Sequence, residues 1–459
     1  MALTMMPVNL FIFNFRKDLL MKKRVKYVIA SLVFCVLLVF CGKFFRYILV
    51  DDTSSYTRIT FHEMYEQDNI DVLFVGSSHC YRAFVPEILD DELGMNTYNA
   101  GTSAQNLDGS YMVIREAAKY NDIKHIYLDI YYNLAFEIYK DRTEMTQTYI
   151  ISDYLRPSLD KIGYLLNAST KEYYFNSFIL ARRNWSKFFD ADYIQNLLMK
   201  KQTDAYKNYE YTYVTGDTEW YAGKGYVANK ERVENWNYFS DNSGNNVDFN
   251  TVSKDWLDSL SDIIAFCDKK DISLTLVSVP MSNFLLADLE NYDDYVNLVK
   301  KSIAGTGVEY YDFNLCKEEY FPNISSLFKD KDHLNNLGAE KFSRLLASFV
   351  KGQVSESTLF YNSFNEKIQI LEPTVFGISY CDNKKENGEI QRDCKIVSTC
   401  NSSLEYEIIL IPDGRKEYKI QDFSDNRFFT VPPGEHGICV ISYRLNSEPE
   451  QVETVEISY

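Results

Sequence analysis

Two short segments, far apart in the chain, carry residue types that serine-based catalysis uses. Gly76-Ser77-Ser78-His79 directly follows a short apolar run, and a serine at such a strand-to-helix turn lies exposed at the carboxyl edge of a sheet. Asp330-Lys331-Asp332-His333 precedes an amphipathic stretch. A carboxylate at Asp330 can hold the His333 imidazole in one tautomer, which leaves the other ring nitrogen to accept a proton from a serine.

Each segment also has a purely structural interpretation. A Gly-Ser-Ser sequence is commonly a simple turn. Asp330 or Asp332 can cap the following helix and leave His333 on the surface. The sequence shows no H-x-x-x-H pattern and no cluster of carboxylates, so we expect neither a catalytic metal nor a cofactor.

Four segments, taken in order, resemble the SGNH (GDSL-type) esterase and acyltransferase superfamily. They are Gly76–His79, Asn99–Ala104, Ile126–Asn133 and Asp330–His333, and the resemblance extends over about residues 71–350. Ser78 occupies the position of the family's nucleophile, and Ser77 replaces its usual Asp. Four blocks in the right order are far more specific than any one motif alone.

The resemblance implies a role for each matching residue. His333 would act as general base on Ser78, with Asp330 orienting the imidazole, so that Ser78 attacks an ester carbonyl and forms an acyl-enzyme. The N–H groups of Ser78 and Ala104, with the amide of Asn133, would bind the tetrahedral oxyanion. Each such donor contributes about 3 kcal/mol to lowering the barrier.

Two positions depart from the family pattern. Ala104 stands where the family has an oxyanion glycine, and Tyr131 and Tyr132 stand before Asn133 where the family has glycines. An alanine N–H can donate at this position if the backbone φ is negative. The departures leave a second function class open, a non-catalytic glycan-binding or scaffold protein. The complete Ser78–His333–Asp330 set favours the enzyme.

The elements expected to position these segments alternate between strands and helices. Apolar runs predict strands over 71–75, 126–130, 274–279 and 308–313, and amphipathic patterns predict helices over 105–120, 256–267 and 339–349. This alternation indicates α/β architecture, a three-layer α/β/α flavodoxin-like domain with a parallel sheet. We expect it over 51–352 with an insertion at about 134–272, followed by a β-rich, sandwich-like accessory domain over 353–459.

Aromatic residues are concentrated in the segment 201–240, inside the predicted insertion. Trp220 and Trp236 are among them. Long insertions near the carboxyl edge of a sheet often form lids. We expect this segment to cover the Ser78 cleft and to stack on carbohydrate. The alternative is a structural subdomain without ligand contact.

The N-terminal part predicts a membrane anchor over residues 1–50. Basic residues precede an uncharged run over 27–42, and the apolar stretch extends to about residue 48. Basic residues before the run place the N-terminus inside and the bulk of the chain outside the cell. A cleaved signal peptide is the alternative, but no small-residue cleavage site follows the apolar core.

Composition and cysteine content limit the remaining possibilities. The 459 residues have 48 Lys and Arg against 65 Asp and Glu, a net charge of −17, so the surface repels phosphate backbones and nucleic acid is not an expected partner. None of the 9 cysteines forms a C-x-x-C pair. The last four can form two disulfides or stay reduced: Cys381, Cys394, Cys400 and Cys439.

An SGNH-like domain tethered outside a membrane is similar to bacterial proteins that acylate surface polymers, among them those of lipoteichoic-acid D-alanylation and polysaccharide O-acetylation. We therefore predict a single-pass, membrane-anchored extracellular serine O-acylesterase or O-acyltransferase. The resemblance implies a surface glycan or teichoic-acid-like polymer as substrate. It also implies a membrane-bound O-acyltransferase as partner.

Overall fold

The computed structural model describes residues 8–138, 145–210, 217–233, 238–241, 247–385, 388, 390–399 and 403–459, with side chains from Arg24 onward. The chain divides into two compact units. One consists of Met1–Thr53 and Lys171–Asn208, and the other of Ser54–Thr170 and Tyr209–Tyr459. The predicted domain boundaries at 51, 352 and 353 stay predictions.

A five-stranded parallel sheet forms the centre of the larger unit. Its strand order is β2 (Thr97–Asn99), β1 (Val72–Val75), β3 (His125–Asp129), β7 (Ser273–Ser278) and β8 (Glu309–Asp312). Every neighbouring pair is parallel. Counted along the chain, this is the 2-1-3-4-5 order of flavodoxin-like folds. The prediction of an α/β domain with a parallel sheet is confirmed.

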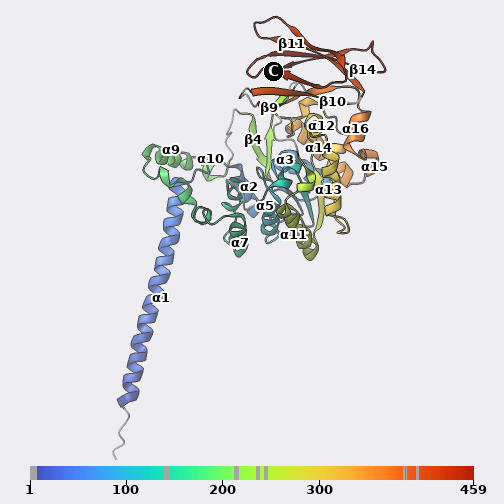
Figure 1. Ribbon diagram of the computed structural model, residues 1–459. Coiled ribbons are helices and arrows are strands. Elements are labelled where there is room, and N and C mark those ends of the chain that lie inside the picture. The colour runs from blue at the N-terminus through green and yellow to red at the C-terminus, as the bar shows by residue number, and fades with distance from the viewer. Residues whose placement is uncertain are drawn as a thin grey trace, which may run out of the picture. The chain divides into compact units, whose positions relative to one another are not determined.

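Helices cover both faces of this sheet (Figure 1). On one face, Val72 and Phe74 belong to a buried cluster with Leu89 of α4 (Pro86–Leu93) and Phe342 of α14 (Asn336–Val350). On the other face, α5 (Leu107–Ala117) contacts β1, and α11 (Lys254–Lys270) contacts both α5 and β7. Strands covered on both faces can be apolar throughout, which explains why all four residues of β1 are buried.

Shorter elements complete the α/β part of this unit. The α-helices are α2 (Tyr56–Glu66), α3 (Ser78–Ala83), α6 (Thr146–Ser152), α7 (Leu159–Ala168), α12 (Asn283–Leu289), α13 (Tyr292–Ser302), α15 (Glu356–Leu359) and α16 (Phe364–Ile370). The 3-10 helices are η1 (Tyr132–Phe136), η4 (Phe249–Thr251), η5 (Phe313–Leu315) and η6 (Ser325–Leu327). A hairpin of β4 (Glu219–Gly223) and β5 (Tyr226–Asn229) contacts α3.

The C-terminal strands form two four-stranded sheets that share one buried core. The first has the order β13 (Phe428–Val431), β10 (Ile390–Ser398), β9 (Val375–Lys384) and β6 (Tyr238–Asp241). The second has the order β12 (Tyr418–Ser424), β11 (Leu404–Pro412), β14 (Gly437–Leu445) and β15 (Glu453–Ser458). The prediction of a β-rich, sandwich-like C-terminal region is confirmed, and the strand pairs among β9–β15 are antiparallel. β6 comes from the predicted insertion and pairs parallel to β9.

The smaller unit is built around one long helix, α1 (Val8–Leu49). Its segment Arg24–Leu49 has 26 residues and a mean hydropathy of 2.5, long and apolar enough to span a membrane, as an anchor or a signal sequence is. The other elements are α8 (Tyr174–Phe178), η3 (Leu180–Lys187), α9 (Ala191–Gln202) and α10 (Asp204–Lys207).

Side chains of this unit bind the carbonyl groups at the end of α1. The buried Lys201 Nζ donates to Tyr47 O (3.0 Å) and Val50 O (2.6 Å), and Tyr193 Oη donates to Leu49 O (2.9 Å). Lys201 also pairs with Asp52 at 3.1 Å. The last carbonyls of a helix have no partner within the helix, so these contacts fix where α1 ends.

The eight cysteines that the structure describes are all unpaired. Cys394 and Cys439 are buried in the core of the C-terminal strands. Cys400 lies outside the described residues.

Candidate active site

Ser78 is placed at the carboxyl edge of the sheet by a turn between β1 and α3. A Cβ added to Gly76 would come within 2.7 Å of Asp129 Cβ at the end of β3, so this close approach requires glycine. Ser77 caps α3, because its Oγ accepts from His79 N at 3.3 Å. Ser78 is therefore the first residue of α3, half-buried, with its N–H at the unbonded end of the helix.

The second predicted segment lies in the loop before α14. Asn335 caps α14 by accepting from Leu337 N (3.0 Å) and Gly338 N (3.1 Å), and its amide donates to Phe328 O (3.2 Å). The alternative in which Asp330 or Asp332 caps this helix is therefore wrong. Both carboxylates remain available to His333.

The structure brings Ser78, His333 and Asp330 together. His333 Nε2 lies 2.8 Å from Ser78 Oγ, and His333 Nδ1 lies 2.9 Å from Asp330 Oδ1. The main-chain N–H groups of His333 and Asp332 also donate to Asp330 Oδ1, at 2.8 and 3.1 Å. These bonds orient the carboxylate, which in turn orients the imidazole, as a Ser–His–Asp triad requires.

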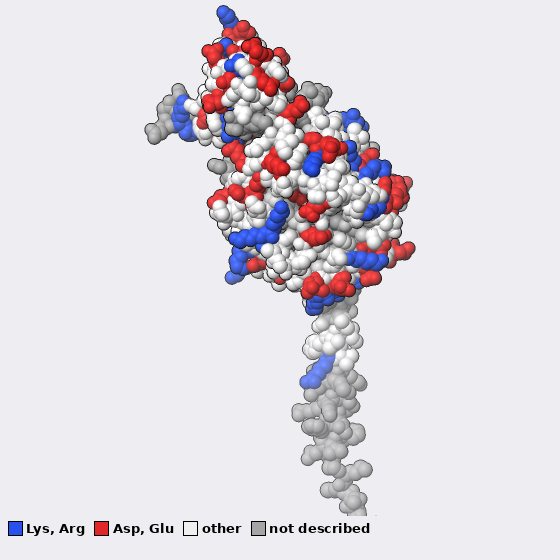
Figure 2. All heavy atoms as spheres, turned by 90° about the vertical axis from the view of Figure 1, so that its right-hand side faces the viewer, with Lys and Arg blue, Asp and Glu red and all other residues white. Residues whose placement is uncertain are grey.

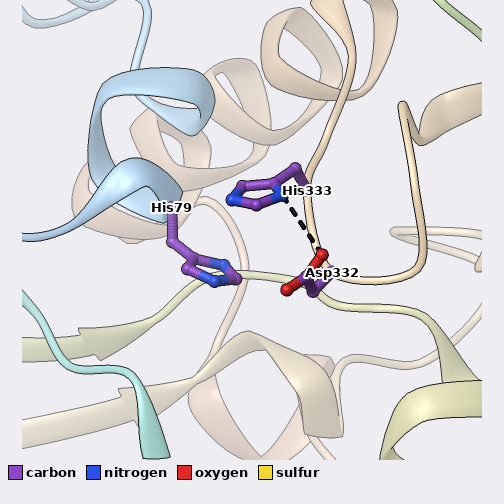
Figure 3. A group of neighbouring side chains, drawn as sticks. All are labelled: His79, Asp332 and His333. Carbon is purple, nitrogen blue, oxygen red and sulfur yellow. Dashed lines mark ion pairs between the residues drawn. The ribbon is translucent and has the colours of Figure 1, made fainter. Parts of the chain in front are cut away.

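Two neighbours of His333, Asp332 and His79, were not given a role in the site by the sequence, and Tyr131, expected only in the loop before Asn133, contacts both of them. Asp332 Oδ1 lies 3.2 Å from His333 Nδ1 (Figure 3). The His79 ring stacks on His333 with centroids 4.7 Å apart, and the Tyr131 ring lies 4.1 Å from that of His79. Tyr131 Oη donates to Asp332 Oδ2 at 3.5 Å. The only sequence signal was adjacency, since His79 follows Ser78 and Asp332 precedes His333.

The two carboxylates strongly affect the protonation of His333. Burial disfavours the charged imidazole, but hydrogen bonds and charge from Asp330 and Asp332 raise the pKa of His333 to about 9. Burial also opposes the charge of Asp330, yet its hydrogen bond with His333 holds the pKa of that carboxyl well below its usual value. Burial, followed by the charge of His333, keeps the pKa of His79 well below 6.5, so His79 is neutral.

A further carboxyl group lies behind the nucleophile. Asp129 is buried at the end of β3, and Ser77 Oγ donates to its Oδ2 at 3.5 Å. Burial raises the pKa of Asp129 to about 7. Ser77 stands where the resembling family has Asp, so Asp129 supplies a carboxyl group close to that position.

His79, Asp332 and His333 form a group that can hold a metal ion. Their donor atoms lie within 4.8 Å of one another (Figure 3). Two imidazoles and a carboxylate are a donor set that suits Zn²⁺. His333 would have to give up a nitrogen that now contacts Ser78 or a carboxylate, so a bound ion would compete with the triad arrangement. The expectation that the chain holds no catalytic metal stays a prediction.

The residues expected to bind the oxyanion lie on two other loops. Ala104 has a φ of 47°, so the condition of a negative φ is not met. Ala104 thus has the backbone conformation of a glycine, which costs an alanine about 1 kcal/mol. The loop is held in this conformation by Tyr56, whose Oη accepts from Ser103 N at 3.1 Å. Asn133 lies in η1, two residues after Tyr131, with an exposed side chain. That these donors converge on one oxyanion stays a prediction.

The structure places only part of the predicted lid. Trp220 lies in β4 and lines a cavity with residues of α4 and α14, and Ser78 is not among the residues that line it. Trp236 lies outside the described residues. The covering of Ser78 by the 201–240 segment stays a prediction.

Fold and site together define an α/β protein with a Ser–His–Asp arrangement at the carboxyl edge of a parallel sheet. No protein-family model and no curated protein matches the chain. Among solved structures, it is similar to a GDSL-like lipase from Bacteroides thetaiotaomicron VPI-5482, with 9% identity and a TM-score of 0.29 over 66% of this chain and 100% of that one. It is also similar to a putative platelet activating factor from Streptococcus pneumonia, with 12% identity and a TM-score of 0.30 over 69% and 99% of the two chains.

Proposed function

We propose that the chain is a serine-dependent O-acylesterase or O-acyltransferase of the SGNH (GDSL-type) kind. One observation carries the proposal. A single imidazole contacts Ser78 Oγ through Nε2 at 2.8 Å and Asp330 through Nδ1 at 2.9 Å. This is the arrangement by which a neutral imidazole removes a proton from a serine hydroxyl.

The reaction follows from this geometry. Neutral His333 accepts the Ser78 proton at Nε2 while Oγ attacks the ester carbonyl, and Asp330 stabilises the resulting imidazolium. The Ser78 N–H and the Asn133 amide stabilise the oxyanion, and the Ala104 N–H joins them from the glycine-type backbone that its positive φ gives, not from the negative φ expected from the sequence. His333 then donates its proton to the departing alcohol. Water or a glycan hydroxyl next attacks the acyl-Ser78 ester and loses its proton to His333. His333 then returns this proton to Ser78 Oγ as the acyl–oxygen bond breaks, which restores the free serine and the neutral imidazole.

The proposed location and substrate follow from the N-terminal helix, and the distribution of charged side chains on the surface bears on nucleic acid as a partner. α1 crosses the cell membrane once, through residues of about 27–48, and the bulk of the chain lies outside the cell. The substrate is an acylated cell-wall polymer or exopolysaccharide, and the partner is a membrane-bound O-acyltransferase. Acidic and basic side chains are interspersed over the face shown in Figure 2, without a continuous basic area, which supports the expectation that nucleic acid is not a partner.

The positive φ of Ala104 favours a second candidate function, a non-catalytic glycan-binding or scaffold protein of a membrane O-acylation system. Alanine holds this backbone at a cost that the family's glycine would not have, so the oxyanion loop is less well suited to catalysis than a glycine loop. The intact contacts of His333 favour the enzyme.

A fluorophosphonate probe decides between the two functions. The full-length protein in detergent is treated at neutral and alkaline pH, and the labelled peptide is mapped by mass spectrometry. We expect labelling of Ser78 that disappears in Ser78→Ala and His333→Ala. The matched control is His125→Ala, a histidine outside the site whose Nε2 lies 3.0 Å from Thr275 Oγ1. Absence of labelling in well-folded protein at both pH values would support the scaffold.

A further inference from the structure

A cavity lies outside the Ser–His–Asp site, between the β4–β5 hairpin, α4 and the start of α14. Its volume is about 690 Å³, which is within the range of small-ligand sites. Trp220 and Tyr226 line it from the hairpin, Pro86 and Asp90 from α4, and Asn336 from α14.

The hairpin that carries the aromatic residues is rigidly attached to the core. Lys224 N donates to Glu63 Oε2 at 2.8 Å, and Asn99 N donates to Lys224 O at 2.9 Å. Gly225 has a φ of +83°, and an added Cβ would lie only 1.6 Å from Asn99 O. The cavity wall is therefore held in place before any ligand arrives, which lowers the ordering cost of binding.

Two buried polar atoms in the cavity wall have no protein partner. Tyr226 is 5% exposed, and neither its Oη nor Asn336 Oδ1 has a hydrogen-bond partner in the part of the chain that the structure describes. A buried polar group left without a partner costs about 1–3 kcal/mol. Burial raises the pKa of Tyr226, so its hydroxyl stays a donor, while Asn336 Oδ1 is an acceptor. Both atoms are shielded from solvent in the unliganded cavity, so a ligand with hydroxyl groups satisfies them once the neighbouring side chains shift to admit it.

The charges around the cavity select against anions. Among the described residues, two cations line it, Lys224 and Arg344, against four carboxylates: Glu87, Asp90, Asp91 and Glu340. Lys224 is already paired with Asp90, and Arg344 lies 3.5 Å from Glu92. A phosphate or carboxylate group would meet excess negative charge here. The half-buried Trp220 offers a ring on which the C–H face of a sugar can stack.

We propose that this cavity binds a sugar residue without negative charge, as a subsite for the glycan on which the enzyme acts. The role in acyl transfer rests on the proposed function, whereas the binding itself does not. The cavity is adjacent in sequence to both triad segments. Val85, which follows α3, and Asn336, three residues after His333, both line it. Arg82 of α3 forms an ion pair with Glu219, the neighbour of Trp220. The subsite selects neutral or amine-bearing sugars over a phosphate-linked backbone.

Calorimetric titration of the full-length protein in detergent tests the subsite. A Ser78→Ala background prevents turnover, and the probes are chitotetraose, cellotetraose and maltotetraose as uncharged oligosaccharides and poly(glycerol phosphate) as the anionic one. We expect at least one uncharged probe to bind, and Tyr226→Phe to weaken it about tenfold, because one hydrogen bond is lost. Trp220→Ala abolishes binding, and the matched control Tyr120→Phe, whose ring is exposed and outside the cavity, leaves it unchanged.

Three outcomes would overturn the subsite. They are equal affinity in Tyr226→Phe, binding of poly(glycerol phosphate) alone, and no uncharged probe bound at millimolar concentration. Fluorophosphonate labelling of Ser78 in the Tyr226→Phe variant separates this proposal from the proposed function. Sugar binding without labelling would support the subsite and refute the enzyme. Labelling without sugar binding would support the enzyme and refute the subsite.

An independent observation concerns the segment 171–208 of the smaller unit, which we name the collar. Large apolar side chains of this segment are exposed: Phe175 (62%), Phe178 (44%), Ile179 (52%), Trp185 (50%), Phe189 (88%) and Met199 (56%). Soluble surfaces rarely expose so many large apolar groups in one short segment. Such groups favour an apolar or interfacial environment.

The collar packs directly on the last turns of α1. The Phe45 ring lies 5.6 Å from Trp185 and 5.9 Å from Phe188, and Trp185 stacks on Phe188 at 5.0 Å. About 20 helical residues cross the hydrocarbon core of a bilayer. Counted from Tyr27, where the uncharged run begins, the crossing ends close to Phe45. The exposed collar residues therefore lie at the level of the outer membrane–water interface, where Trp and other aromatic residues concentrate.

We infer that the collar rests on the outer leaflet of the membrane, with Trp185 and Phe189 inserted among the lipid headgroups. This inference rests on α1 spanning the bilayer. An apolar face laid into an interface is stabilised in proportion to the apolar area that it buries. The collar would thereby hold the smaller unit against the membrane surface.

Fluorescence quenching by brominated lipid tests the collar. The full-length protein is reconstituted in phosphatidylcholine vesicles brominated at the headgroup end of the acyl chains. We expect quenching of wild-type tryptophan emission that Trp185→Phe loses and that Trp220→Phe retains. An equal quenched intensity in wild type and Trp185→Phe would refute the collar. Alkaline carbonate extraction reports separately whether α1 is inserted.

Discussion

Replacing Asp332 by Asn should make the proposed enzyme faster at neutral pH. The reactive base is neutral His333, so activity is lost as the pH falls below the pKa of His333. That pKa is raised to about 9, so only about 1% of the imidazole is neutral at pH 7. A change that lowers this pKa moves the acidic limb of the pH profile to lower pH and increases the reactive fraction.

The expected size of the shift follows from the position of Asp332. Its Oδ1 lies 3.2 Å from His333 Nδ1, and its side chain is 25% exposed, so solvent screens part of the interaction. A charge at this distance and exposure contributes on the order of 1–2 kcal/mol, or about one pKa unit. Asp332→Asn should therefore lower the pKa of His333 to about 8 and increase the rate at pH 7 by close to tenfold.

The rate of fluorophosphonate labelling of Ser78, followed between roughly pH 6 and pH 10, measures this limb without knowledge of the natural substrate. Asp332→Glu is the matched control, because it keeps the charge and should keep the limb near its wild-type position. An unchanged or upward-shifted limb in Asp332→Asn would show that Asp332 does not stabilise the imidazolium. A wild-type limb below pH 7 would refute the whole electrostatic description of the site.

Other predictions concern single contacts. Asp330→Asn should reduce the labelling rate by roughly 10³–10⁴ at every pH, since the imidazole loses its orientation, and a loss confined to acidic pH would contradict this role. Tyr56→Phe removes the acceptor for the Ser103 N–H, so kcat for hydrolysis of an activated ester should fall about tenfold. The acidic limb of the pH–rate profile should stay at its wild-type position. A shifted limb would show that Tyr56 affects His333 and not only the loop that carries Ala104. Zn²⁺ should inhibit labelling, and a chelator should restore it. His79→Ala should raise the inhibitory Zn²⁺ concentration about tenfold, because one of three ligands is lost. Equal inhibition of wild type and His79→Ala would exclude His79 as a ligand. Lys201→Met removes the cation that pairs with the largely buried Asp52, whose carboxylate keeps the hydrogen bond from Tyr206 Oη at 3.1 Å. The smaller unit should lose about 3 kcal/mol of stability, seen as faster proteolysis within 171–208, and unchanged proteolysis would contradict this.

The sequence predicted the parts of the site that the sheet positions. Ser78 follows β1, and His333 precedes α14, so the topology of a parallel α/β fold is enough to bring the two segments to one edge. The local motif is also enough for Asp330, because residues three apart in a turn face the same way.

The rest of the site depends on tertiary contacts with no local signature. Stacking of His79 between Tyr131 and His333 joins three separate segments, and no periodic pattern marks it. The positive φ of Ala104 is imposed by the loop and by Tyr56, against the preference of alanine itself. β6 lies inside the predicted insertion, and the sequence did not predict its pairing with β9. The two strands are over a hundred residues apart, and strand pairing at that distance leaves no local signal.

The contacts at the end of α1 can form only late in the synthesis of the chain. Lys201 and Tyr193, which bind the carbonyls of Tyr47, Leu49 and Val50, are synthesised about 150 residues after the helix. At 5–20 residues per second, the ribosome needs roughly 8–30 s to reach them. During that interval the helix end must rely on water for its hydrogen bonds. The part of the smaller unit in residues 171–208 therefore completes its contacts with α1 only late in synthesis.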